Sequence, residues 1–240
     1  MGHLDSKVAV VTGANRGIGK AIAISYAREG ACVALVCRSA PDETMKDIKN
    51  AGGKCKAFHH NLADVEGIEG LVQKIAEECG TIDILFNNAG AQSRHPCVDF
   101  PLSDWYSVMD VNCNAVFFLC RHAGKIMIEK GYGKIINMAS VLSFQGGLTV
   151  PAYAASKGAV MQFTKSLSNE WAKLGVNVNC IAPGYFDTDM NTALMNDPVR
   201  SRQILERIPA GRWGKPEDLP ARRLFWQDLH LIMLTALSCR

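Results

Sequence analysis

Short apolar runs alternate with longer stretches of helical period along the chain. The first three pairs of predicted strand and helix are 7–13 with 17–30, 32–38 with 42–52, and 55–61 with 64–80; strands at 82–90, 133–140 and 176–184 and helices at 110–131 and 152–174 follow. A strand, a helix and a second strand in succession are typical of a parallel sheet with right-handed crossovers. The pattern predicts an α/β fold, a doubly wound parallel sheet in three α/β/α layers.

Length and composition narrow the class of protein. No repeat, linker or low-complexity segment divides the 240 residues, so we expect a single domain over 1–240. No apolar run is long enough to span a membrane, and the net charge of +3 comes without a basic block, which argues against a nucleic-acid partner. The start of the chain has no signal-type segment, so we expect a cytoplasmic protein. The nine cysteines are scattered without a CxxC pair, and we predict free thiols and no metal site.

Three glycines follow the first predicted strand, in the stretch TGANRGIG at residues 12–19. Gly13, Gly17 and Gly19 allow the backbone to approach a pyrophosphate at the start of the next helix, where amide N–H groups and the helix dipole favour negative charge. A tight turn could use the same glycines for structural reasons alone. Their position between a strand and a helix favours a dinucleotide site in a Rossmann-type sheet.

A tyrosine and a lysine lie four positions apart in YAASK, at residues 153–157. In a helix these positions share one face, so the Lys157 ammonium can lie near the Tyr153 hydroxyl. An adjacent positive charge lowers the pKa of a phenol from its ordinary value of about 10. The pair therefore predicts a proton donor and acceptor that works near neutral pH, although such a pair is also common on a solvated helix face.

Taken together, these motifs resemble the short-chain dehydrogenase/reductase family of classical type. The glycine turn matches the family's TGxxxGxG, and the other matching stretches are NNAG at 87–90, Asn112 in DVNCNAVF, Ser140 at the end of IINMAS, YxxxK at 153–157 and APGYFDT at 182–188. The resemblance extends from residue 5 to about residue 220. It implies an enzyme that interconverts a secondary alcohol and a ketone by hydride transfer to or from a nicotinamide dinucleotide, with a homotetramer or dimer as its assembly.

The resemblance also implies roles for single residues. It places Ser140 at the reacting oxygen, Lys157 at both the phenol and the nicotinamide ribose, and Asn112 at a water that feeds a proton relay. Asn112 could instead make only a hydrogen bond between helices. The spacing to Tyr153 selects Ser140 over Ser143, which leaves Ser143 as a structural or substrate-loop hydroxyl. The predicted cofactor-binding residues are Gly13, Asn15, Arg16, Gly17, Ile18, Gly19, Arg38, Asn61, Leu62, Asn88, Ala89, Gly90, Tyr153, Lys157, Pro183, Gly184 and Thr188.

The end of the second predicted strand bears on the choice of cofactor. NAD sites of this fold usually present an acidic residue there to the ribose 2′-hydroxyl, whereas this chain has Cys37 and Arg38. No carboxylate repels a 2′-phosphate, so we predict NADP(H), with NAD(H) the weaker candidate. Arg16 could contact the phosphate as well, or could be only an exposed turn residue. Asn61 replaces the aspartate that usually contacts the adenine, and an amide can still hydrogen-bond the adenine amino group.

The second half of the chain resembles the sugar-acid, or gluconate-type, branch of the family. Arg94 follows the fourth predicted strand, where ligands of open α/β sheets bind, and could pair with a substrate carboxylate; a solvated loop arginine is the alternative. The predicted substrate residues are Arg94, Ser140, Gln145 and Tyr153. Reduction of a 3-oxoacyl thioester or of a neutral keto-sugar of the sorbose type would use the same catalytic set.

Residues 221–240 depart from the family pattern. Family members continue with a helix and a final strand, so we expect the last strand to be missing or altered, and a reading-frame shift in the coding DNA near residue 220 is our hypothesis for the change. An exposed sheet edge would lower stability and weaken the oligomer. A dinucleotide-binding protein with impaired catalysis is the alternative from another functional class, and the intact Ser140, Tyr153 and Lys157 argue against it.

Overall fold

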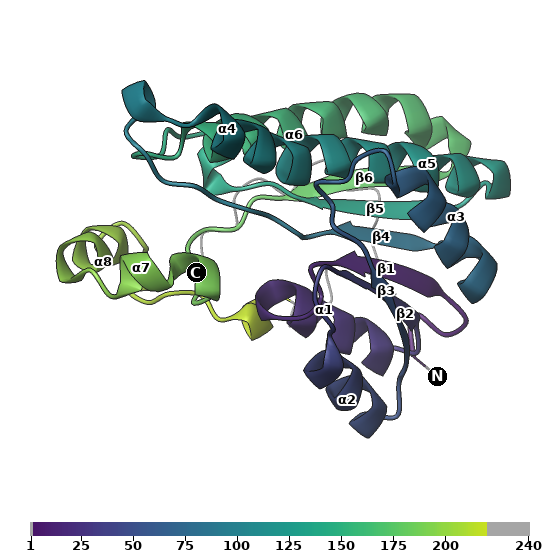
Figure 1. Ribbon diagram of the computed structural model, residues 1–240. Coiled ribbons are helices and arrows are strands. Elements are labelled where there is room, and N and C mark those ends of the chain that lie inside the picture. Colours follow the sequence, from purple (N-terminus) through teal and green to yellow (C-terminus); the bar gives the residue numbers. More distant parts are fainter. Residues whose placement is uncertain (1, 220–240) are drawn as a thin grey trace.

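The structure, a computed structural model, describes residues 2–219 (Figure 1). Six parallel strands form one sheet in the order β3-β2-β1-β4-β5-β6. The strands are β1 (Val8–Thr12), β2 (Cys32–Cys37), β3 (Lys54–His59), β4 (Ile84–Asn87), β5 (Gly133–Met138) and β6 (Val176–Ile181). The helices are α1 (Gly17–Arg28), α2 (Asp42–Asn50), α3 (Ile68–Cys79), α4 (Leu102–Met109), α5 (Ala115–Lys130), α6 (Pro151–Trp171), α7 (Thr192–Met195) and α8 (Pro198–Leu205). The predicted doubly wound parallel sheet is confirmed.

Both faces of the sheet are covered by helices (Figure 1). Successive strand residues point to opposite faces. In β1, Val10 packs with α3, α5 and α6, whereas Ala9 and Val11 pack with α1 and α2. Because neither face of the sheet meets solvent at β1 and β4, all residues of these two strands are buried, and this explains why both appear in the sequence as nearly continuous apolar runs.

A network of polar side chains lies inside the core, between the sheet and the helices α5 and α6. Asn87 and Asn137 are directly paired in the register of β4 and β5, and the Asn87 Nδ2 donates to the Asn137 Oδ1 at 2.8 Å. The Asn137 Nδ2 donates in turn to the Thr164 Oγ1 at 3.0 Å, and the Cys120 thiol lies 3.4 Å from both amides. The network therefore ties two central strands to two helices.

The structure contains helices that the periodicity does not predict. The helix predicted at 110–131 is preceded by α4 and by one turn of π-helix, Asp110–Asn114, so that regular α5 begins only at Ala115. The short α4 exposes the apolar Leu102 and Tyr106, which blurs its amphipathic pattern. Helices α7 and α8 follow β6 and lie beside the sheet rather than on its faces (Figure 1).

Within residues 2–219, β6 is an edge strand with β5 as its neighbour. The prediction of an altered last strand concerns residues 221–240 and lies outside the described residues. None of the helices in the described part of the chain is both long and apolar enough to cross a membrane.

Candidate active site

The predicted site residues gather at one edge of the sheet because all six strands are parallel. Their carboxyl ends face the same way, and the strand order reverses between β1 and β4, which creates a crevice at this edge. The glycine turn follows β1, NNAG ends β4, Ser140 follows β5, and the APGYFDT segment follows β6. Segments that are distant in sequence therefore meet at one place.

The glycine turn after β1 leaves room for a ligand at the start of α1. Gly13 has a φ of 64°, in the left-handed region that favours glycine. A Cβ on Gly19 would collide with the Gly13 carbonyl oxygen and the Asn88 amide. Helix α1 has no side-chain cap and no acidic residue in its first turn, so its first N–H groups are available to an anion. The shape of this glycine cradle and its free N–H groups are compatible with a dinucleotide pyrophosphate, and the assignment of Gly13, Gly17 and Gly19 to that group stays a prediction.

Thr12 joins this turn to the segment after β4, and the sequence analysis did not single it out. Its Oγ1 accepts hydrogen bonds from the backbone N–H groups of Asn88 at 2.9 Å and Ala89 at 3.0 Å. The Asn88 side chain returns a bond to the Thr12 carbonyl at 3.0 Å. The only sequence signal for Thr12 is its position before Gly13. Asn88 thus has a clear structural role in holding the crevice together.

Ser143 links the end of β5 to α6. Its Oγ accepts the Ser140 N–H at 3.2 Å and donates to the Lys157 carbonyl at 2.7 Å. The Ser140 Oγ accepts the N–H of Leu142 at 3.1 Å. These bonds fix Ser140 relative to the helix that carries Lys157, and they agree with the interpretation of Ser143 as a structural hydroxyl.

Tyr153 and Lys157 lie on one face of α6, with the Lys157 Nζ 5.7 Å from the centre of the tyrosine ring. The Nζ donates to the carbonyl of Met138, at the end of β5, at 2.6 Å. Burial raises the pKa of Tyr153, while a hydrogen bond with Ser140 and the charge of Arg94 oppose the increase. The prediction that Lys157 lowers this pKa is therefore wrong for the structure described, because burial outweighs the nearby charges and the ammonium is directed at Met138.

Asn112 is fully buried in the π-helical turn. Its Oδ1 accepts the Ala91 N–H at 2.7 Å, and its Nδ2 donates to the Ala91 carbonyl at 2.9 Å and to the Ser156 Oγ at 3.2 Å. The Asn112 side chain therefore holds the segment after β4 against α6, next to Tyr153. A bulge of this kind in a helix is frequent at functional sites.

The residues predicted to contact the adenosine half of the cofactor follow β2 and β3. Arg38 is exposed at the end of β2, and the Asn15 side chain beside it donates to the Ser39 Oγ at 3.1 Å. Asn61 is exposed, but its Oδ1 accepts the Ala63 N–H at 3.3 Å. Leu62 is only 7% exposed and packs in the core. Arg38 is thus open to a phosphate, whereas Asn61 and Leu62 also shape their own loop.

An ion pair spans the crevice from the glycine turn to the segment after β6. The Arg16 Nη1 lies 2.9 Å from the Asp189 Oδ2, and both side chains are mostly exposed. Close by, the Thr188 methyl group would be 3.5 Å from a Cβ on Gly17. The predicted cofactor residues Arg16, Gly17 and Thr188 therefore lie together. Pro183 and Gly184 precede Thr188 on the segment after β6, Ile18 lies in the first turn of α1, and Gly90 lies in the segment after β4.

Arg94 is held in the loop after β4 by its neighbours. The His95 Nε2 donates to the Asp104 carboxylate on α4 at 2.8 Å, and the His95 N–H donates to the Thr149 carbonyl at 3.0 Å. The charge of Arg94 acts on Tyr153, and partial burial lowers the pKa of Arg94 itself. The structure therefore brings Arg94 near the phenol, while Gln145 lies exposed on the loop that ends at Thr149.

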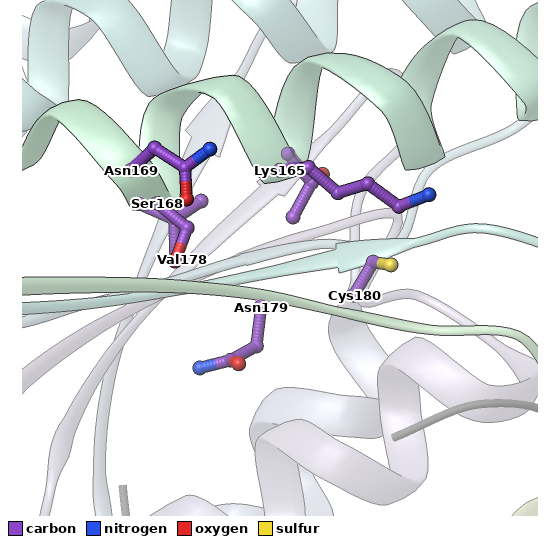
Figure 2. Close-up of a pocket in the computed structure, with 7 residues that line it drawn as sticks. Lys165, Ser168, Asn169, Val178, Asn179 and Cys180 are labelled. Atoms are coloured by element: carbon purple, nitrogen blue, oxygen red, sulfur yellow. The ribbon is translucent and has the colours of Figure 1, made fainter. Parts of the chain in front are cut away.

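A separate pocket of about 300 Å³ opens between α6 and β6. Figure 2 shows Lys165, Ser168 and Asn169 projecting from the helix near Val178, Asn179 and Cys180 of the strand. None of the predicted site residues lines this pocket. Across residues 2–219, no group of three or more His, Cys, Asp or Glu side chains is arranged to hold a metal ion.

The buried lysine gives a prediction for the pH dependence of stability. Burial lowers the pKa of Lys157 from 10.5 to about 8. Between these values the unfolded chain binds more protons than the folded chain, so the free energy of unfolding rises with pH. The penalty for the buried charge is complete below about pH 8 and disappears above about pH 10.5. Relative to Lys157→Met, the wild-type protein should gain about 2 kcal/mol between pH 7.5 and pH 10.

Urea unfolding of both proteins across this pH range measures the difference. Lys173→Met, which removes an exposed lysine just after α6, is the matched control and should follow the wild-type curve. A constant difference between wild type and Lys157→Met at all pH values would contradict the predicted charge burial.

Comparison with known proteins agrees with this geometry. A family model described as short chain dehydrogenase matches residues 7–198. The chain is 46% identical over 225 residues to the 2-dehydro-3-deoxy-D-gluconate 5-dehydrogenase of Pseudoalteromonas atlantica. The aligned region covers 92% of this chain and 89% of that protein.

Two solved structures are similar in both sequence and fold. A candidate 2-deoxy-D-gluconate 3-dehydrogenase from Agrobacterium tumefaciens with bound NADP has 45% identity and a TM-score of 0.88, covering 95% of this chain and 91% of that one. A candidate NAD(P)-dependent gluconate 5-dehydrogenase from Beutenbergia cavernae, with NADP at low occupancy, has 44% identity and a TM-score of 0.89. The match covers 93% of this chain and 90% of that one.

Proposed function

Because this chain belongs to the short-chain dehydrogenase family, we propose that it is an NADP(H)-dependent oxidoreductase that interconverts a secondary alcohol and a ketone on a sugar acid. The observation that carries the proposal is the convergence of Ser140, Tyr153 and Lys157 beside the glycine cradle. The Ser140 hydroxyl hydrogen-bonds the phenol of Tyr153, and the Lys157 ammonium lies under the same ring. The three groups needed to hold and protonate a carbonyl oxygen therefore share one place.

The chain's own residues position the reactants and move the proton. The Tyr153 hydroxyl donates its proton to the carbonyl oxygen during reduction, and its raised pKa keeps it protonated at neutral pH. Ser140 holds the same oxygen by a hydrogen bond. Lys157, whose Nζ lies 5.7 Å from the centre of the tyrosine ring, would hold the nicotinamide ribose by a hydrogen bond. When bound, the nicotinamide ring supplies the hydride for reduction or accepts it in oxidation.

We propose that Arg38 and its neighbours make the protein prefer NADP(H) to NAD(H). Its exposed guanidinium follows β2, where a 2′-phosphate of adenosine would lie. Cys37, the preceding residue, brings no negative charge that would repel this phosphate. Arginine binds phosphate through two parallel hydrogen bonds, and this geometry favours NADP(H) over NAD(H). The two solved relatives with bound NADP support the same choice.

The sugar-acid substrate class rests on the relatives' names and on Arg94. The relatives are described as acting on gluconate or its deoxy and dehydro derivatives. Arg94 lies near Tyr153 and has no ion-pair partner among the described residues. A substrate with a ketone at one position and a carboxylate farther along its chain would satisfy both residues. An arginine–carboxylate pair also fixes orientation, because its two hydrogen bonds are directional.

The proposal is tested by following NADPH oxidation by the purified protein through its absorbance. The substrates are a keto-sugar acid such as 5-keto-D-gluconate, the neutral ketose L-sorbose and an acetoacetyl thioester, with NADH tested in parallel. We expect turnover of the keto acid with NADPH and slower turnover of all substrates with NADH. Turnover of only the thioester or only the ketose would contradict the assigned substrate class.

We also propose that the chain forms a homo-oligomer through apolar side chains on α4 and α5. Leu102 and Tyr106 lie four positions apart on α4 and are 72% and 60% exposed, and Phe117 on α5 is 38% exposed. Exposed apolar side chains of this size favour a protein partner when they are contiguous. Light scattering should give a dimer or tetramer for the wild type and a smaller species for Leu102→Glu/Tyr106→Glu. A monomeric wild type would overturn this proposal.

A further inference from the structure

A second pocket, of about 330 Å³, lies where α8 faces the segment after β6. Its lining is rich in charged and polar groups, namely Tyr185, Arg200, Gln203, Ile204, Glu206 and Arg207. None of these residues was predicted from the sequence to bind the cofactor or the substrate. The polar lining and the excess of arginine over glutamate make this pocket suited to an anion.

The start of α8 determines which way Arg200 points. The Asp197 side chain caps the helix by accepting the N–H groups of Val199 at 2.9 Å and Arg200 at 3.0 Å. Ile204, four positions after Arg200, is only 5% exposed, and residues at this spacing share one helix face. Arg200 therefore lies on the inward face of α8. Arg202, with its side chain 74% exposed, lies on the outward face.

Tyr185 connects this pocket with the catalytic groups. It lines the pocket together with Arg200, and it directly follows Gly184 on the segment after β6. It is also close enough to Arg94 and Tyr153 to influence the pKa of each. Its ring is also held in place by an edge contact with Trp213, at 5.6 Å between ring centres. The pocket therefore borders the candidate active site, because Tyr185 lies on the same segment as the predicted site residues Pro183, Gly184 and Thr188.

Arg94, in the loop after β4, and Arg200, on α8, belong to two different elements, and their positive charges repel each other. Within the described residues neither guanidinium has a carboxylate at ion-pair distance; the one carboxylate in the pocket, Glu206, lies 3.8 Å from the outward Arg202. Arg200 makes a hydrogen bond to the neutral Gln203 at 3.3 Å. Two cations that repel each other and lack a carboxylate partner are both stabilised by an anion that binds between them.

We infer that Arg200 is a second carboxylate-binding residue of the substrate site, which closes on the acid end of the substrate opposite Arg94 while Tyr153 and Ser140 hold the ketone. The inference rests on the proposed function. It adds α8 to the substrate-binding elements, and it makes the distance between the phenol and the arginine pair a determinant of which ketone position is reduced.

The test compares Arg200→Gln with Arg202→Gln, a matched loss of charge on the outward face of the same helix. With NADPH, Arg200→Gln should raise the KM for 5-keto-D-gluconate by roughly 10- to 100-fold, as expected for loss of a charge-assisted hydrogen-bonded pair. The kcat should change much less, and the KM for L-sorbose should stay the same. Arg202→Gln should match the wild type on both substrates, and Arg200→Lys should recover part of the loss.

Equal KM values for the keto acid in the wild type, Arg200→Gln and Arg202→Gln would overturn the inference. An equal rise in KM for the keto acid and for L-sorbose would also overturn it, because the role of Arg200 would then be structural. Circular dichroism and thermal unfolding verify that each variant is folded.

Calorimetric titration of the NADPH-saturated proteins with D-gluconate, which the reduced cofactor cannot oxidise, separates this inference from the proposed function. Weaker binding by Arg200→Gln than by Arg202→Gln supports the inference, and equal binding overturns it. If the wild type reduces no keto acid, the proposed function fails, while the same titration still decides whether Arg200 binds the carboxylate.

Discussion

Replacing Tyr153 by Phe should lower kcat by roughly 10²- to 10⁴-fold, the range that a positioned proton donor contributes. The change removes one oxygen atom and keeps the ring on the face of α6 above Lys157. Without the hydroxyl, the oxygen that accepts hydride cannot receive its proton from the protein. The measurement is steady-state NADPH oxidation with a keto-sugar acid, together with a titration of NADPH binding.

NADPH binding should change much less than kcat in Tyr153→Phe, because the glycine cradle, Lys157 and Arg38 are not altered. Tyr132→Phe is the matched control, since Tyr132 lies just before β5, at the edge of the sheet opposite the site, and it should keep the wild-type kcat. A Tyr153→Phe enzyme with more than a tenth of the wild-type kcat would show that the proton comes from another group.

Replacing Gly19 by Ala should weaken cofactor binding strongly. The new Cβ would meet the Gly13 carbonyl oxygen and the Asn88 amide, and the Gly13 oxygen belongs to backbone that cannot move aside cheaply. Overpacking of this kind costs about 1–3 kcal/mol, which corresponds to roughly a 5- to 150-fold increase in Kd for NADPH if it displaces the cradle. Fluorescence titration with NADPH measures the change, and thermal unfolding should show a lower Tm.

Gly70→Ala provides the control for Gly19→Ala. Gly70 lies within α3, and a Cβ there would meet no atom within 4 Å. Because alanine is the better helix former, this variant should be about 0.5–1 kcal/mol more stable than wild type, with unchanged NADPH affinity. Equal affinities in Gly19→Ala and wild type would mean that the turn can relax without loss of the cofactor site.

The strands, the glycine turn and the Tyr153–Lys157 pair could be predicted because their signals are local. A strand buried on both faces is a short apolar run, and residues four apart in a helix share a face whatever surrounds them. The family resemblance then indicated Ser140 and Asn112, which lie beside that pair in the structure.

The parts that could not be predicted depend on distant contacts. The direction of the Tyr153 pKa follows from burial by elements far apart in the chain, and local spacing carries no information about it. Arg200 was not identified because α8 is short and lies beside the sheet, so only the folded chain shows that its inward face meets Tyr185. Thr12 likewise acquires its role from Asn88, 76 positions later.

The buried amides of Asn87 and Asn137 bear on how the chain reaches this fold. Sliding β5 by one residue along β4 would turn the Asn137 side chain from the α6 face to the α1 face. It would then lose both Asn87 and Thr164 as partners, and each buried polar group left unpaired costs about 1–3 kcal/mol. Apolar neighbours such as Ile135 and Ile136 would tolerate that slip far better. The two amides therefore disfavour misaligned pairing of β4 and β5 during folding. They help to set the register of the strands whose carboxyl ends carry the candidate active site.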